Sequence, residues 1–274
     1  SRIKGKIIHR MIEGYLKFKD INHFADDIES LRQQGGIGEY DLLWFDENRV
    51  KRMMEQLGIN DDEFGNTDIA FRDNIASELM MVNEDLNIGT SNDGIIEHSD
   101  GAVTFADYKT GAKFLADENG VRPMLYNNGL SSPIFNTRLN KAKLELVMRM
   151  VIAKMNKPDL KVRDLKIAYL SRYYGNQIRN VDVQSYLDYV NNNMRITIKE
   201  LEKDVKEDPS LRETLNQKRK EYKAMQDAKV FDFHNYQGES KFFEQDVDLQ
   251  TITDPQKKIE FLNYIQRYRL IILL

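Results

Sequence analysis

The sequence predicts an α/β fold: a mixed central sheet of about five strands flanked by helices, with a C-terminal helical extension from about residue 183. Three observations support this prediction. Apolar residues recur at helical spacing near the N-terminus and again after residue 137. Short apolar runs separated by turn signals fill residues 75–110, and the segment 183–229 is long, highly charged and nearly free of glycine.

The N-terminal part has the pattern of consecutive helices. Residues 4–18 predict an amphipathic helix, because apolar side chains recur every three or four positions: Ile8, Met11, Ile12, Tyr15 and Leu16. His9 lies at the edge of this apolar stripe. Residues 22–58 predict further helices, interrupted at Gln34-Gly35-Gly36, and Trp44 is expected to anchor a core.

A meander of strands is expected from Ile75 onward. Its apolar runs are residues 79–82, 95–96 and 102–105, with turn signals between them. Residues 112–137 contain several Gly, Pro and Asn residues and therefore predict a long loop or lid. A helix over about residues 138–155 and a strand near 165–171 follow, which indicates that the chain returns to the same sheet.

The C-terminal third predicts a helical hairpin over residues 183–229, with Pro209 at a helix start directly after Asp208. We therefore expect a core with an N-terminal helical segment, residues 1–182, and a helical extension packed on it, residues 183–274. The apolar residues 270–274 suggest a chain cut from a longer protein, although a buried last helix turn or strand explains them nearly as well.

The composition excludes several kinds of protein and site. None of the 274 residues is cysteine, so disulfides, thiolate nucleophiles, cysteine zinc sites and iron–sulfur clusters are excluded. No stretch approaches the roughly 18 apolar residues that a membrane span needs, and the first residues lack the apolar region of a secretory signal. These features favour a cytoplasmic protein with no membrane partner.

The charges are distributed unevenly although the net charge is only -4. Residues 1–100 contain 11 basic and 21 acidic side chains, whereas residues 138–180 contain 11 basic and 3 acidic ones. An acidic part that collects a divalent cation, beside a basic part that collects phosphate, suits a metal-dependent nucleic-acid enzyme. Ordinary variation in surface charge is the alternative explanation.

Chemically active side chains are expected together at one end of two strands. Asp107 and Lys109 alternate along one predicted strand and so point to the same face, and Asp93 reaches this point from the preceding strand. Two carboxylates with open positions suit Mg²⁺ or Mn²⁺, and the lysine can orient or deprotonate an attacking water. These groups serve phosphodiester hydrolysis, although acidic-x-Lys triplets are common in so charged a chain, and Asp93-Gly94 is also typical of a plain turn.

Four segments in this order resemble motifs of the PD-(D/E)XK nuclease superfamily, in particular its RecB-like branch, which includes phage-type exonucleases. Residues 5–13 are similar to the N-terminal helix with a metal-binding histidine, and residues 76–79 to the acidic motif that precedes the first strand. Residues 92–96 resemble the second-strand aspartate motif, and residues 105–111 the Asp-x-Lys strand. The resemblance covers about residues 3–172 and implies a restriction-endonuclease-like core.

This resemblance implies roles for individual residues. It implies a metal site formed by four groups: His9, Asp93, Asp107 and the carbonyl oxygen of Tyr108. It also implies that Lys109 assists the attacking water and that Glu78 supports the site. The remaining histidines match no motif and are expected to be structural: His23, His98 and His234.

Nucleic-acid contacts are expected from the basic stretch after residue 137, with four candidates: Lys141, Lys143, Arg149 and Tyr173. A solvated helix face is the alternative. The family often follows its core with a Gln-x-x-x-Tyr helix, whereas Glu145 and Arg149 hold the matching positions here.

The expected activity is that of a Mg²⁺- or Mn²⁺-dependent deoxyribonuclease, an exonuclease of DNA recombination, repair or phage DNA processing in a bacterial cell or phage-infected host. The expected partners are DNA and either the rest of a longer chain or a recombination complex. A catalytically inactive nuclease-fold module that binds nucleic acid or protein stays open, and so does a site-specific endonuclease.

Overall fold

The computed structural model describes residues 2–58, 75–98, 101–110, 122–172 and 175–233, with the side chains of residues 75–79 outside this description. All of the described residues belong to one compact unit. Among the described helices, none combines the length and the apolar character that crossing a membrane requires.

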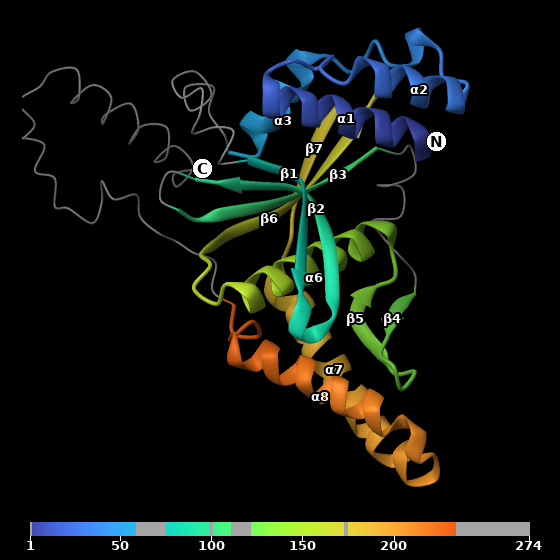
Figure 1. The fold of residues 1–274 in the computed structure, drawn as a ribbon, viewed down its shortest axis with the longest axis vertical. Coiled ribbons are helices and arrows are strands. Elements are labelled where there is room, and N and C mark those ends of the chain that lie inside the picture. The colour runs from blue at the N-terminus through green and yellow to red at the C-terminus, as the bar shows by residue number, and fades with distance from the viewer. Residues whose placement is uncertain (1, 59–74, 99–100, 111–121, 173–174, 234–274) are drawn as a thin grey trace, which may run out of the picture. The chain divides into compact units, whose positions relative to one another are not determined.

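A five-stranded mixed sheet forms the centre of this unit, in the spatial order β1-β2-β3-β6-β7 (Figure 1). The strands are β1 (Ile75–Asn83), β2 (Ile88–Glu97), β3 (Val103–Lys109), β6 (Val162–Ser171) and β7 (Gly175–Asn180). Neighbours pair antiparallel except β3 and β6, which are parallel and joined through α6 (Arg138–Asn156). The predicted α/β fold with about five strands is confirmed, although β7 is not among the strands expected from the sequence.

Helices cover both faces of the sheet (Figure 1). On one face lie α1 (Arg2–Phe18), α2 (Ala25–Gly35) and α3 (Glu47–Gln56), and on the other lies α6, followed by α7 (Val183–Glu207) and α8 (Arg212–Asp227). Each face has its own buried apolar cluster, because every strand between two helical layers must bury both of its faces. The fully buried side chains Ile12 and Met53 belong to the α1 side, and Leu146 and Met150 to the α6 side.

The expected long loop after β3 contains a β-hairpin where the structure describes it. Strands β4 (Pro123–Leu125) and β5 (Ser131–Phe135) pair antiparallel, and Gly129 adopts a φ of 81° in the turn between them. The Gly and Asn residues that predicted a loop therefore mark the tight turn of a short two-stranded ribbon. Proline is tolerated in its two strands because edge strands have positions where no backbone N–H needs to donate a hydrogen bond. Residues 111–121 of the expected loop lie outside the described residues.

The hairpin of helices α7 and α8 is confirmed. Asp208 directly follows α7, and its carboxylate accepts a hydrogen bond from the Ser210 backbone N–H at 3.0 Å, which caps a short 3₁₀ turn (Pro209–Leu211) before α8. α8 ends at Asp227, so the predicted boundary near residue 229 is correct to within two residues.

Candidate functional site

Strand β3 directs its functional side chains toward α6. Phe105 packs in the apolar cluster on the α6 side of the sheet, whereas Tyr108 packs in the cluster on the α1 side. Because successive side chains of a strand point to opposite faces, Asp107 and Lys109 share the face of Phe105. The predicted alternation of Asp107 and Lys109 is therefore observed.

Strand β2 adds the second aspartate to the same face. Ile95 packs against the cluster on the α6 side, and Ile96 belongs to the cluster on the α1 side, so Asp93 faces α6 with Asp107. Asp93 is only 9% exposed and Asp107 only 1%. Two buried carboxylates on one face are costly unless positive charge or hydrogen bonds compensate them.

Two cations neutralise Asp107. Arg149 Nη1 donates a hydrogen bond to Oδ1 at 2.8 Å, and the Lys109 ammonium lies 2.7 Å from Oδ2. The lysine contact is an ion pair without favourable hydrogen-bond direction, so the buried Oδ2 atom has no hydrogen bond within the described part of the chain. This carboxylate oxygen therefore keeps the capacity to bind a further ligand.

Asp93 is held by weaker contacts. Its Oδ2 accepts a hydrogen bond from the Tyr108 backbone N–H at 3.0 Å and lies 3.8 Å from His9 Nε2, whereas its Oδ1 lies 3.9 Å from Arg149 Nη1. Burial, and secondly the charge of Asp107, raise the pKa of Asp93 to about 6. The attraction of His9, the Tyr108 N–H and Arg149 opposes this rise only in part.

Helix α1 brings His9 to the ends of these strands. A Cβ atom on Gly5 would lie only 3.0 Å from Thr110 Oγ1, so the missing side chain lets α1 approach the chain directly after β3. His9 Nε2 lies 3.0 Å from the carbonyl oxygen of Tyr108, and the two rings meet edge to face at 5.9 Å. The predicted proximity of His9, Asp93 and the Tyr108 carbonyl is thus present.

Arg149 joins the acidic site rather than an outer nucleic-acid surface. Its side chain is 16% exposed and bonds to Asp107 from helix α6. The sequence held a signal for this position, because Arg149 follows Ala142 by two helical turns and Leu146 by three residues, and both of these side chains are buried. The helix therefore presents Arg149 on its buried, sheet-facing side.

The other predicted residues are placed less fully. Glu78 lies inside β1 rather than before the first strand, and its side chain is outside the described residues, as is all of Tyr173. Lys141 is exposed and Lys143 half-buried near the N-terminal end of α6.

The histidines that were expected to be structural belong to no candidate site among the described residues. His98 is buried and hydrogen-bonded to Thr104 Oγ1 at 2.8 Å, and His23 stacks on Phe18. His234 lies outside the described residues.

The arrangement has donors for one hard divalent cation, although within the described residues no three His, Asp or Glu side chains are grouped closely enough to form a metal site. Arg149 lies by the Oδ1 atoms of both aspartates, whereas Asp107 Oδ2 lies by Lys109 and Asp93 Oδ2 by His9. Asp107 Oδ2, which has an ion pair but no hydrogen bond in the described part of the chain, the carboxylate of Asp93 and the Tyr108 carbonyl supply the oxygen ligands that Mg²⁺ and Mn²⁺ prefer. The residues therefore fit such a cation, with His9 as a further donor.

Comparison with known proteins identifies no family for this chain. No protein-family model matches the sequence, and no curated protein is significantly similar to it.

Proposed function

We propose that this chain is a metal-dependent deoxyribonuclease that hydrolyses phosphodiester bonds, an exonuclease of DNA recombination, repair or phage DNA processing acting in the cytoplasm. One observation carries the proposal. Two buried aspartates lie on one face of neighbouring strands: Asp93 Oδ2 contacts the Tyr108 N–H and lies near His9, and Asp107 Oδ2 pairs with Lys109. Along the chain, helices α1–α3 precede three antiparallel strands, and the β4–β5 hairpin, helix α6 and the parallel strand β6 follow. The three strands, the helix and the parallel strand support the resemblance to PD-(D/E)XK nucleases.

The charge balance of the site suits a phosphate substrate. Asp93 and Asp107 carry two negative charges when ionised, and Arg149 and Lys109 carry two positive charges. Mg²⁺ or Mn²⁺ bound here would polarise the phosphate and stabilise the charge that develops on its oxygens. With both carboxylates ionised, the loaded site has a net positive charge and attracts a phosphodiester anion.

The remaining groups of the site hold the carboxylates in place and orient the attacking water. Arg149 fixes the Oδ1 atom of Asp107 at 2.8 Å, which keeps the opposite oxygen directed at the ligand side. Lys109 is the more exposed member of its ion pair, with 28% of its side chain accessible, so its ammonium can donate a hydrogen bond to an attacking water. His9 and the Tyr108 carbonyl close the site on the α1 side.

A cleavage assay tests this proposal. End-labelled linear DNA and closed circular DNA are incubated in Mn²⁺, in Mg²⁺ and in chelator with the wild type, Asp107→Asn and Lys109→Met. We expect metal-dependent loss of linear DNA alone, abolished by both substitutions. Cutting of the circle would instead indicate an endonuclease, and no cleavage with either metal would refute the proposed activity.

The chain offers a matched control for these substitutions. Asp164-Leu165-Lys166 is another Asp-x-Lys triplet that lies on a strand, β6, and its lysine and aspartate also form an ion pair, at 3.2 Å. Its Asp164 bonds to Thr104, and Lys166 donates to the Leu57 carbonyl, so neither side chain belongs to the carboxylate site. The variants Asp164→Asn and Lys166→Met should keep the activity.

A second candidate function is a catalytically inactive module that binds nucleic acid or protein. It is favoured by the two ion pairs of Asp107, with Arg149 and Lys109, which balance the charge of this carboxylate without a metal. Titration calorimetry with Mn²⁺ separates the two candidates. Specific binding that is lost in Asp107→Asn supports the enzyme, and the absence of specific binding supports the inactive module.

A further inference from the structure

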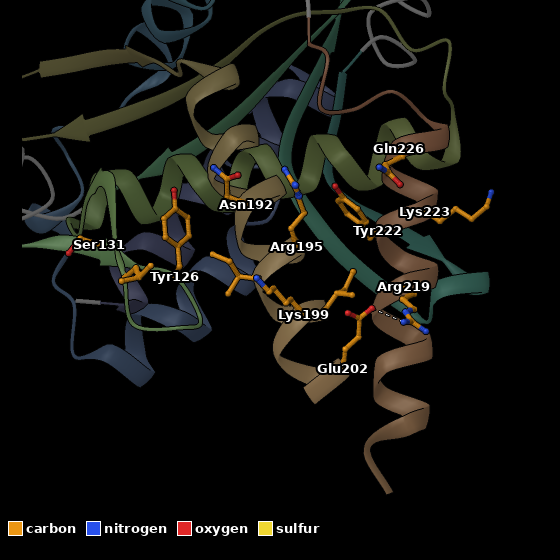
Figure 2. Close-up of a pocket in the computed structure, with 13 residues that line it drawn as sticks. Tyr126, Ser131, Asn192, Arg195, Lys199, Glu202, Arg219, Tyr222, Lys223 and Gln226 are labelled. Carbon is orange, nitrogen blue, oxygen red and sulfur yellow. Dashed lines mark hydrogen bonds and ion pairs between the residues drawn. The ribbon is translucent and has the colours of Figure 1, made fainter. Parts of the chain in front are cut away.

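A groove between the C-terminal helices and the β4–β5 hairpin forms a second candidate site (Figure 2). Its volume is about 770 Å³, and its walls come from α7, α8 and the tip of the hairpin. The residues that line it include none from the carboxylate site. The groove is therefore a separate place from the carboxylate site.

The two helices present basic side chains to the groove. Arg195 and Lys199 on α7 are four residues apart, as are Arg219 and Lys223 on α8, so each pair projects from one face of its helix. All four side chains are exposed. Among the described residues that line the groove, Glu202 is the only acidic one, so the lining carries an excess of positive charge.

Only half of this positive charge is compensated. Arg219 pairs with Glu202 at 2.6 Å, and Lys223 pairs with Asp227 at 2.6 Å. Arg195 and Lys199 have no ion pair with any residue that the structure describes, and Figure 2 shows both side chains directed into the space between the elements. These two cations are available to an anionic ligand.

Two aromatic rings line the same groove and are already fixed in position. Tyr126 stacks on Tyr189 at 5.2 Å between ring centroids, and Tyr189 donates a hydrogen bond to the Leu125 carbonyl at 3.0 Å. Tyr222 donates to Asn191 Oδ1 at 2.8 Å. Because these contacts hold the rings before any ligand arrives, little entropy is lost when a planar group stacks on them.

We propose that this groove binds single-stranded nucleic acid, with phosphates at Arg195 and Lys199 and bases stacked on Tyr126 and Tyr222. Residues four apart on a helix are displaced by about 6 Å along its axis, so the cations suit a polymer of repeated phosphates rather than one phosphate group. Aromatic rings beside basic side chains are typical of single-strand binding, since the bases of a duplex are not free to stack on protein.

The experiment measures binding without cleavage. A fluorescein-labelled oligothymidylate of about 12 nucleotides is titrated with the full chain in chelator, and fluorescence anisotropy gives the affinity between about 50 and about 200 mM salt. Arg195→Glu/Lys199→Glu tests the phosphate contacts, and Tyr126→Leu tests stacking. The control Lys203→Glu/Arg212→Glu changes the net charge equally, at exposed positions of α7 and α8 that do not line the groove.

We expect Arg195→Glu/Lys199→Glu to weaken binding by about tenfold or more and to reduce the salt slope by about 1.4, which corresponds to two phosphate contacts. Tyr126→Leu should weaken binding by about fivefold or more, and the control should bind like the wild type. Equal effects in the groove variant and the control would overturn the assignment, and so would equal affinity for an oligoglutamate peptide. If the wild type binds the oligonucleotide as expected but cleaves no DNA in the separate metal-dependent assay, only the nuclease proposal is refuted.

Discussion

Replacing Asp93 by asparagine should make the metal-free protein more stable. The pKa of Asp93 in the folded protein is about 6, whereas the ordinary value is 3.8, because burial and the neighbouring Asp107 disfavour its charged form. Between these two pH values the folded state binds more protons than the unfolded state, so stability falls as the pH rises toward 6. Above that pH the ionised carboxylate costs the folded state about 3 kcal/mol, at about 1.4 kcal/mol per pKa unit.

The asparagine variant removes this cost while keeping a needed contact. An amide oxygen at position 93 can still accept the hydrogen bond of the Tyr108 backbone N–H, which the carboxylate accepts at 3.0 Å. Urea unfolding in chelator, followed by circular dichroism, should therefore show Asp93→Asn more stable than the wild type by up to about 3 kcal/mol at about pH 7.5. The difference between the two proteins should shrink to less than about 1 kcal/mol at about pH 4.

An exposed aspartate provides the control. Lys4 lowers the pKa of Asp41 through a hydrogen bond and its charge, so Asp41→Asn should bring no gain in stability at neutral pH. The reasoning is refuted if Asp93→Asn is no more stable than the wild type at neutral pH, or if its advantage is the same at both pH values. A confirmed gain would mean that the chain accepts a destabilised carboxylate pair, as sites kept for ligand binding do.

Two further substitutions test the geometry of the site. Arg149→Gln should destabilise the metal-free protein by about 3 kcal/mol, because Asp107 loses the guanidinium that bonds to its Oδ1 atom. Urea unfolding in chelator measures this loss, and unchanged stability would contradict the role of Arg149 in holding Asp107. Gly94→Ala should lower the melting temperature and the Mn²⁺ affinity, because a Cβ atom at position 94 would overlap the buried Tyr108 hydroxyl. The control Gly89→Ala should change neither quantity, because a Cβ atom at position 89 makes only ordinary contacts at 3.7 Å. Equal effects of the two alanine substitutions would refute this packing argument.

The sequence alone indicated the elements that depend on local pattern. The helical repeat of residues 4–18 and the alternation of Asp107 and Lys109 follow from the geometry of a single helix or strand. The hairpin of α7 and α8 was also recognisable, since Asp208 and Pro209 are local helix signals. Such patterns need no knowledge of distant parts of the chain.

Elements whose form depends on partners were predicted less well. Strand β7 carries the polar sequence Gly175–Asn180 and is a strand because it pairs with the buried β6. The β4–β5 hairpin was interpreted as a loop because its turn residues dominate the local pattern, yet Tyr126 and Asn127 attach its tip to α7 through Tyr189 and Asn193. In both cases tertiary contacts outweigh weak local preference.

The functional site shows the same division between local and distant information. Sequence pattern placed Asp93 and Asp107 on neighbouring strands and assigned Lys109 to the second of them, because hairpin-connected strands usually pair. The parallel pairing of β3 with β6 and the insertion of Arg149 between the two carboxylates appeared only in the folded chain. Arg149 and Asp107 lie 42 residues apart, and their contact depends on how helix α6 packs on the sheet. Side-chain burial across such separations is a property of packing, which no local repeat specifies.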